Sequence, residues 1–310
     1  MKFKQSLMVF VVIVLGCSFF ACAKRIEEPV QMRKLRVVTT LFPLYDMAKS
    51  IGADKTEVLL LVPPGVEAHS FEPRPSDIFK INEADIFVYT GKFMEPWAAD
   101  VINGAVNKNL VVVDASHGAK MIPGVSHDAD EPAGSLDPHI WLDFDNAGIM
   151  VKNILQAFQV KDSANKALYE QKAGEYSRKL TELDSLYKTT LAACKHRTIV
   201  YGGHYAFGYP ARRYGLSYLA AQGVSPDAEP TANDLVKLVE QIKKERIRYI
   251  FYEELTSPRI TETIAGETNA EMLLLNAAHN VSRYQLDQGV SLFDILRRNL
   301  ENLSKGLDCR

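Results

Sequence analysis

The chain has 310 residues, 47% of them hydrophobic and 24% charged, and this ordinary globular composition excludes collagen-like, fibrous and wholly disordered proteins. Lysine and arginine number 36 against 38 aspartate and glutamate, a net charge of −2, which gives no sign of the strongly basic face that nucleic-acid binding requires. At about 100–200 residues per domain, the length allows two domains.

The first residues have the pattern of a secretory signal. Lys2 and Lys4 precede an almost unbroken apolar run from Leu7 to Phe20, and the next charged residue is Lys24. A basic start followed by a short apolar core is typical of a signal peptide, whereas a membrane-spanning helix needs about 20 apolar residues. We therefore expect the body of the protein to work outside the cytoplasm.

Two cysteines stand at the end of this run. Cys17 and Cys22 each directly follow a small residue, a pattern similar to the bacterial lipobox, in which a signal peptidase cleaves before a cysteine that carries lipid. Either cysteine fits, and Cys22 is favoured because a polar stretch begins after it. We expect residues 1–22 to be signal peptide and lipobox, residues 23–33 a tether, and the protein to be lipid-anchored at the membrane, in the periplasm or on the outer side of the cell membrane.

Residues 34–161 alternate between strand and helix patterns. This rhythm predicts an N-terminal α/β lobe, a mostly parallel sheet with helices on both faces. Strands are expected over Leu35–Thr40, Glu57–Val62, Asp85–Tyr89 and Leu110–Asp114, and helices over Pro43–Ala53, Pro75–Glu83, Pro96–Gly104 and Asn146–Phe158. Residues 115–138, rich in glycine, proline and acidic side chains, interrupt the rhythm and are expected to form a rim loop.

The longest predicted helix runs from Asp162 to about Ala193, without proline and with apolar residues at three- and four-residue steps. About 30 helical residues span about 45 Å, so we expect residues 162–194 to form a spine that links two lobes. Residues 195–310 then predict a C-terminal lobe. Its expected strands are Thr198–Tyr201, Leu216–Ala220, Arg248–Tyr252 and Glu271–Leu275, and its expected helices are Asn233–Glu245, Pro258–Glu267 and Ser291–Lys305. The predicted fold class is α/β, with two (β/α)4 lobes joined by one long backbone helix.

Three histidines have distinctive surroundings. His69 and His204 each follow a predicted strand, and His139 lies at the exit of the rim loop. Ligands of open α/β sheets bind at the carboxyl ends of strands, and neutral imidazole is a good ligand for zinc and similar ions. Singly, each could be a hydrogen-bonded structural histidine, but three in corresponding positions favour a metal site.

The phrases around these histidines resemble the metal-binding receptors of bacterial ABC importers, the ZnuA/TroA-like (cluster A-I) substrate-binding family. The motifs that carry this resemblance are Pro64-Gly65 with His69 to Pro73, Asp137 to Asp143, and Gly203 to Tyr209. The resemblance extends from about Leu35 to Leu307. The resemblance implies a metal ion buried between two lobes. It implies His69 and His139 as ligands from the N-terminal lobe and His204 as a ligand from the C-terminal lobe.

The resemblance also implies a function. The chain would capture a divalent transition metal ion outside the cytoplasm and deliver it to a membrane permease served by a separate cytoplasmic ATPase, because this chain has no Walker A sequence. Three imidazoles favour Zn²⁺ as the transported ligand, and Mn²⁺ or Fe²⁺ stays open. We expect no organic cofactor, no enzymatic activity, no nucleic-acid partner and a monomer.

The fourth ligand departs from the family pattern, which has an aspartate after the last strand. Asn276 occupies that position here, and its amide oxygen is a weaker ligand. Asn276 could bind weakly or only cap the next turn; His279 could enter instead, or water or a nearby glutamate could complete the set. Glu253 and Glu254 end a strand at the same rim and could orient His204 or a bound water, or be a solvated pair.

Two other groups of residues carry weaker hypotheses. His127, Asp128 and Asp130 in the rim loop could form a weak collecting site for metal, and a plain acidic loop is the default. Cys194 and Cys309 are the cysteines outside the signal segment, and outside the cytoplasm they could form a disulfide. The alternative is two free thiols.

Two functions of other classes compete with the receptor. A zinc hydrolase also needs three histidines and an open position, but the chain has no His-Glu-x-x-His sequence and no clear general base beside a ligand. A surface adhesin is compatible with a lipid-anchored location, although nothing in the sequence supplies that role.

Overall fold

The computed structural model describes residues 33–124, 135–224, 230–255 and 257–310. Within these ranges, no helix has the length and apolar character needed to cross a membrane. Cys17 and Cys22 lie outside the described residues, as do His127, Asp128 and Asp130. Lys34–Arg310 pack as one compact unit, and the domain boundaries expected on either side of the long helix stay predictions.

The first sheet has four parallel strands in the order β2-β1-β3-β4. They are β1 (Leu35–Thr39), β2 (Thr56–Leu60), β3 (Ile86–Tyr89) and β4 (Val111–Asp114). The helices of this half are α2 (Phe42–Gly52), α3 (Pro75–Glu83), α4 (Ala98–Asn103) and α5 (Phe144–Lys161). One sheet face packs against α2 and α5 in the main core, while α3 and α4 cover the other with a separate apolar cluster.

The second sheet repeats this arrangement with the parallel order β6-β5-β7-β8. Its strands are β5 (Thr198–Tyr201), β6 (Ser217–Ala220), β7 (Tyr249–Tyr252) and β8 (Glu271–Leu274). Its helices are α7 (Gly208–Tyr214), α8 (Ala232–Glu245), α9 (Arg259–Thr268), α10 (Arg283–Asp287) and α11 (Leu292–Gly306). Two four-stranded parallel sheets with helices confirm the predicted α/β class. The short helices α7 and α10 were not predicted, because five to seven residues carry too little helical periodicity.

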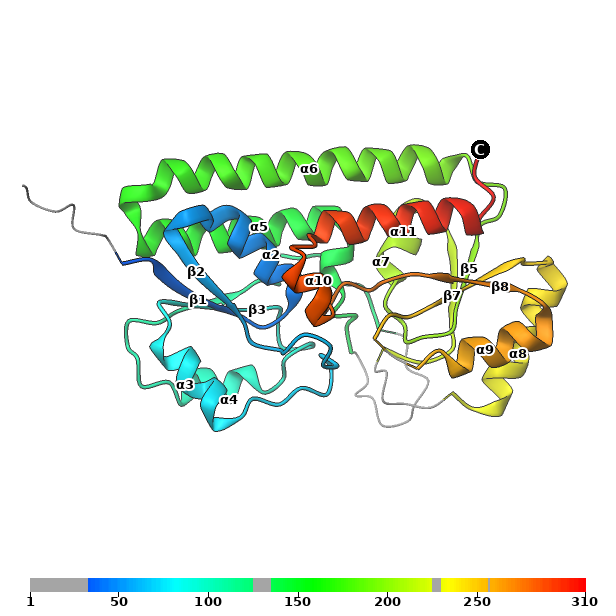
Figure 1. Ribbon diagram of the computed structural model, residues 1–310, viewed down its shortest axis with the longest axis horizontal. Coiled ribbons are helices and arrows are strands. Elements are labelled where there is room, and N and C mark those ends of the chain that lie inside the picture. The colour runs from blue at the N-terminus through cyan, green and yellow to red at the C-terminus, as the bar shows by residue number, and fades with distance from the viewer. Residues whose placement is uncertain (1–32, 125–134, 225–229, 256) are drawn as a thin grey trace, which may run out of the picture. The chain divides into compact units, whose positions relative to one another are not determined.

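The long helix α6 (Lys166–Ala192) runs beside α2 and α5 of the first half and α7 and α11 of the second (Figure 1). Its apolar residues Tyr176, Leu183 and Leu191 are buried in a core that continues across both halves. The helix begins later than expected because the Asp162 carboxylate accepts hydrogen bonds from the Asn165 amide at 2.6 Å and the Tyr169 hydroxyl at 2.7 Å. These bonds hold a tight turn between α5 and α6.

Cys194 and Cys309 are joined by a disulfide. Cys194 lies two residues after the end of α6, and Cys309 is the penultimate residue of the chain. The bond therefore ties the end of the long helix to the C-terminus. The loop it closes spans 115 residues of sequence, and cross-links across long loops constrain the unfolded chain most in the chain-entropy model.

A buried glutamate occupies the carboxyl ends of β1 and β3, where the strand order of the first sheet reverses. The Glu95 carboxylate is 2% exposed. It accepts the Thr40 hydroxyl and the backbone N–H groups of Thr90 and Gly91, the latter two at 3.0–3.1 Å. Burial raises the pKa of Glu95 to about 7, although these hydrogen bonds oppose the shift.

This shift predicts a pH dependence of stability. Between the ordinary value of 4.5 and about 7, the folded chain holds the Glu95 proton while the unfolded chain loses it, so the free energy of unfolding falls as pH rises. Glu95→Gln cannot ionise. We expect the stability of the wild type relative to Glu95→Gln to fall by on the order of 2–3 kcal/mol from pH 4.5 to 7.5 in urea titrations of metal-free protein. If the difference in unfolding free energy between the wild type and Glu95→Gln did not change with pH, Glu95 would not be protonated in the folded protein over this range.

Candidate metal centre

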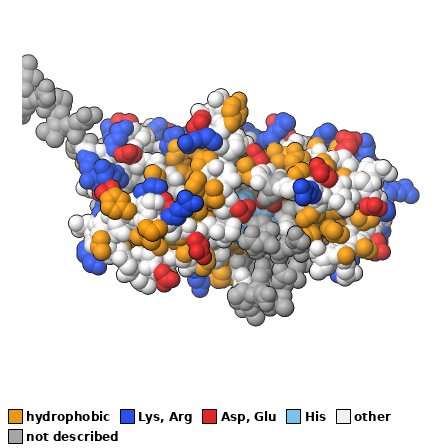
Figure 2. Space-filling model, turned by 60° about the horizontal axis from the view of Figure 1, so that its bottom comes forward, with side chains coloured by type: hydrophobic (Ala, Val, Ile, Leu, Met, Phe, Trp, Pro, Cys, Tyr) orange, Lys and Arg blue, Asp and Glu red, His pale blue; other side chains and the backbone are white. Residues whose placement is uncertain are grey.

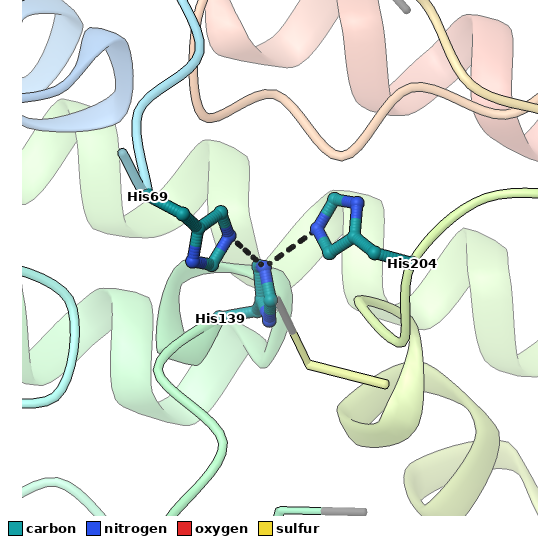
Figure 3. A group of neighbouring side chains, drawn as sticks. All are labelled: His69, His139 and His204. Atoms are coloured by element: carbon teal, nitrogen blue, oxygen red, sulfur yellow. Dashed lines mark hydrogen bonds between the residues drawn. The ribbon is translucent and has the colours of Figure 1, made fainter. Parts of the chain in front are cut away.

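Three imidazoles that are far apart in the sequence meet at one point (Figure 3). His69 lies between β2 and α3, His139 directly precedes the short 3₁₀ turn Ile140–Leu142, and His204 lies between β5 and α7. The His139 Nε2 atom is 3.2 Å from His69 Nε2 and 3.0 Å from His204 Nε2. The structure thus brings together the three histidines that the sequence singled out.

These separations suit a small tetrahedral ion. Zinc–nitrogen bonds of about 2.1 Å in a tetrahedron place neighbouring nitrogen atoms about 3.4 Å apart, close to the two measured distances. His139 and His204 are fully buried and His69 is partly exposed. A small histidine surface is visible near the middle of the face in Figure 2. His69 is the member of the three-histidine cluster that solvent reaches.

Two of the imidazole rings each contact a carboxylate through the nitrogen that points away from the centre of the cluster. His139 Nδ1 is 2.7 Å from Asp137 Oδ1, and His204 Nδ1 is 2.8 Å from Glu253 Oε2. Each carboxylate favours a proton on Nδ1, which leaves the Nε2 lone pair directed at the common centre. The sequence predicted an orienting role for Glu253 but not for Asp137, whose only signal is its position two residues before His139.

Glycine at position 203 allows the contact between His204 and Glu253. A Cβ atom there would lie 2.6 Å from Glu253 Oε2 and 2.7 Å from the Tyr201 ring, closer than real Cβ contacts. His204 follows β5 and Glu253 follows β7, the two strands between which the order of the second sheet reverses. This is where open α/β sheets hold their ligands.

Burial sets the charge of the cluster. It lowers the pKa of both His69 and His139 well below the usual value, and the neighbouring imidazoles act in the same direction. Both rings are therefore neutral at neutral pH, with lone pairs free to bind a cation. Burial opposes ionisation of Glu253, but its contact with His204 outweighs burial and lowers the pKa of this carboxyl.

His279 is the fourth imidazole of the site. Its ring centroid is 5.6 Å from that of His204 and 5.9 Å from that of His69, and it groups with His204 and Glu253 within metal-binding reach. Its Nε2 atom is 3.6 Å from Glu67 Oε1. Burial lowers the pKa of His279, but the Glu67 carboxylate outweighs burial and raises it above the usual value.

Glu67 was not predicted as part of the site. Its Oε1 atom also accepts the backbone N–H of His69 at 3.0 Å, so one carboxylate touches two of the four histidines. Among the described residues, the buried atoms His279 Nδ1, Glu253 Oε1 and Asp137 Oδ2 have no hydrogen-bond partner. Unpaired buried polar atoms cost free energy, and a bound cation is one way to remove that cost.

Asn276 and Glu254 are hydrogen-bonded to each other and to neighbouring groups. The Asn276 side-chain oxygen accepts the Ala278 N–H at 2.7 Å, and its amide donates to Glu254. Glu254 also accepts the Gln285 amide at 2.8 Å. Asn276 thus caps the turn that leads to His279.

The chain matches the family model described as zinc-uptake complex component A, periplasmic, over residues 37–306. It is 37% identical over 281 residues to the high-affinity zinc uptake system protein of Bacillus subtilis, covering 88% of each chain. It is 34% identical to the zinc-binding protein AdcA of Streptococcus pyogenes, covering 87% of this chain and 55% of that longer protein. The Zn(II)-bound ZnuA-like domain of Streptococcus pneumoniae AdcA superposes with a TM-score of 0.76 at 32% identity, over 89% of this chain and 99% of that domain.

Proposed function

We propose that this chain, which belongs to the family of zinc-uptake complex component A, periplasmic proteins, is an extracytoplasmic receptor that captures Zn²⁺ between its two lobes. It delivers the ion to the permease of an ABC importer, whose ATPase is a separate cytoplasmic chain. The observation that carries this proposal is the convergence of three Nε2 atoms, with the two nearest separations at 3.0 and 3.2 Å. Zinc-binding relatives of 34–37% identity support it.

His69, His139 and His204 are the proposed ligands, and His279 is the proposed fourth. His279 supplies a buried ring nitrogen without a partner among the described residues, whereas both polar atoms of the Asn276 side chain are engaged. An all-imidazole set favours Zn²⁺ over Mn²⁺, which prefers carboxylate and other oxygen ligands. Fe²⁺ is also bound by imidazole, so competition decides between these two ions.

The carboxylates around the histidines balance the charge of the ion. Imidazole binds a metal ion in its neutral form, so histidine ligands leave the full 2+ charge of zinc in a mostly buried place, and a buried charge without a partner is costly. Asp137, Glu253 and Glu67 each contact a histidine ring or backbone. Glu253 and Glu67 supply negative charge behind the ligands. Burial raises the pKa of Asp137 to about 7, and this group holds the His139 ring in place.

A binding role agrees with this arrangement better than hydrolysis does. The carboxylates of Asp137 and Glu253 are hydrogen-bonded to histidine Nδ1 atoms, and Glu67 pairs with His279. A general base must be free to take a proton from a metal-bound water. The contacts of these carboxylates with imidazoles favour an orienting role over that of a general base.

Export and lipid anchoring complete the proposal. The apolar segment that ends at Cys17 and Cys22 would carry the chain out of the cytoplasm and attach it to the membrane that holds the permease. A single chain contains all the proposed ligands, so a monomer suffices for capture. The lipidated cysteine is identified by mass spectrometry of the membrane-extracted protein.

Zinc titration tests the function directly. Chelator-treated protein is expected to gain about 4 kcal/mol of stability at a free zinc concentration 1,000 times Kd. For a chain of this size, that gain raises Tm by roughly 10 °C. Mn²⁺ at the same concentration should raise Tm less, and Mg²⁺ serves as the control for ionic strength. No zinc-dependent rise would refute the proposal.

A further inference from the structure

The segments that flank residues 125–134 form a short antiparallel ribbon, Ile122–Gly124 against Ser135–Asp137. Pro123 pairs with Leu136. The Gly124 N–H donates to the Ser135 carbonyl at 2.9 Å, and the Asp137 N–H donates to the Ile122 carbonyl at 2.9 Å. The second strand of this ribbon leads directly into His139.

One rung of the ribbon is completed by a side chain from the other half of the molecule. In an antiparallel ribbon, every second pair of facing residues exchanges two N–H···O bonds. Ile122 and Asp137 are such a pair, but they make only one of the two bonds directly. In place of the second, the Ile122 N–H donates to the Tyr209 hydroxyl at 3.3 Å, and that hydroxyl donates to the Asp137 carbonyl at 2.7 Å. Tyr209 is on α7 and only 3% exposed.

Asp137, whose backbone carbonyl accepts the Tyr209 hydroxyl, also contacts the proposed metal ligand His139. Its Oδ1 atom accepts the His139 backbone N–H at 2.9 Å and contacts His139 Nδ1 at 2.7 Å. The helix approaches Asp137 so closely that a Cβ atom on Gly208 would lie 2.9 Å from Asp137 Oδ2. The position of His139 therefore depends on where α7 holds the Asp137 backbone.

The helix that carries Tyr209 is itself anchored. Arg213, one turn further along α7, donates to Asp184 of α6 at 2.8 Å and to Asp145 of α5 at 2.9 Å. His204 lies four residues before the start of α7. One short helix thus follows His204 closely in the sequence and holds the ribbon that leads to His139.

We propose that Tyr209 is a positioning residue for metal capture. Its hydroxyl sets His139 at its distance from His204 before the ion arrives, so less ordering remains to be done on binding. Without the hydroxyl, the Ile122 N–H and the Asp137 carbonyl lose their partner in a buried place, and the ribbon must shift or admit water. This inference rests on the proposed capture of zinc by His139 and His204.

Tyr209→Phe removes the hydroxyl and keeps the ring. Partners behind metal ligands are worth 10–100-fold in affinity, and Tyr209 acts one step further away, so we expect zinc affinity to fall about 10-fold. Tyr214→Phe is the matched control, because that hydroxyl is on the same helix and donates to Asp184 at 2.7 Å, away from the ribbon. The visible absorption spectrum of bound Co²⁺ should change in Tyr209→Phe and not in Tyr214→Phe.

Equal zinc affinity in Tyr209→Phe and the wild type would overturn the proposal. So would equal losses of affinity in both tyrosine variants, since that result describes a merely structural hydroxyl. Hydrogen exchange of the metal-free protein adds a readout that needs no zinc. We expect faster exchange of the Ile122, Gly124 and Asp137 amides in Tyr209→Phe only, and unchanged exchange would overturn the anchoring whether or not the wild type binds zinc.

If Tyr209→Phe does not fold, hydrogen exchange of the wild type still tests whether the Tyr209 hydroxyl holds the ribbon. The Ile122 amide, whose partner is the Tyr209 hydroxyl, should then be protected in the metal-free protein to the same degree as the Asp137 amide, which has a backbone partner. Rapid exchange at Ile122 alone would show that the hydroxyl does not hold the ribbon, and would overturn the proposal.

Discussion

Replacing His139 with alanine is expected to lower zinc affinity by more than about 100-fold, because changing only the groups behind a ligand already costs 10–100-fold. His139 is the central ring of the cluster, with its Nε2 atom closest to those of His69 and His204. Isothermal titration with a competing chelator measures the change. The effect should be as large in magnesium-containing buffer, because Mg²⁺ prefers oxygen ligands.

The control for His139→Ala is His117→Ala, which removes an exposed imidazole from the same half of the chain. His117→Ala should bind zinc like the wild type. Since His139 is fully buried, His139→Gln is a second variant that keeps most of the volume. Wild-type affinity in folded His139→Ala would remove this residue from the ligand set.

His279→Ala is expected to weaken zinc binding strongly, by roughly 100-fold, while Asn276→Asp changes it by less than about threefold. The expectation follows from the unpaired ring nitrogen of His279 and from the hydrogen bonds that occupy Asn276; loss of a ligand exceeds the 10–100-fold cost of changes behind one. Competition titrations of the two variants decide which residue completes the set.

The opposite pattern would favour Asn276 over His279 as the fourth ligand. If Asn276→Asp tightened zinc binding and His279→Ala left it unchanged, the amide position would face the metal and His279 would be an orienting group for Glu67. A metal-free melting curve for each variant separates lost affinity from lost stability, because His279 is buried and pairs with Glu67 at 3.6 Å.

Local sequence patterns determined the class of the fold. Apolar strand segments separated by helical periodicity require a parallel sheet covered on both faces, and the two observed strand orders have that form. The long helix was visible because its apolar residues repeat over many turns. Helix α7 was not visible, because seven residues with two glycine or proline positions carry no periodic signal.

Motifs within a few residues also determined the candidate ligands. His69, His139 and His204 each lie in a short phrase with its own turn residues, so their roles could be proposed before any geometry was known. The partners of these rings were harder to find. Asp137 and Glu67 lie two residues from a histidine, but sequence proximity does not say which way a carboxylate points.

Only the tertiary structure brought His279 to the cluster and showed which side chains support it. His279 joins the cluster because Asn276 caps a turn and the following segment crosses to the first half, where the His279 carbonyl accepts the Phe42 N–H at 3.2 Å. Tyr209 reaches Asp137 across 72 residues of sequence. Such contacts depend on how segments that are far apart in the sequence pack together, and no local sequence pattern determines that packing. The composition and periodicity of the chain specify its layers, while packing between those layers specifies which polar atoms meet.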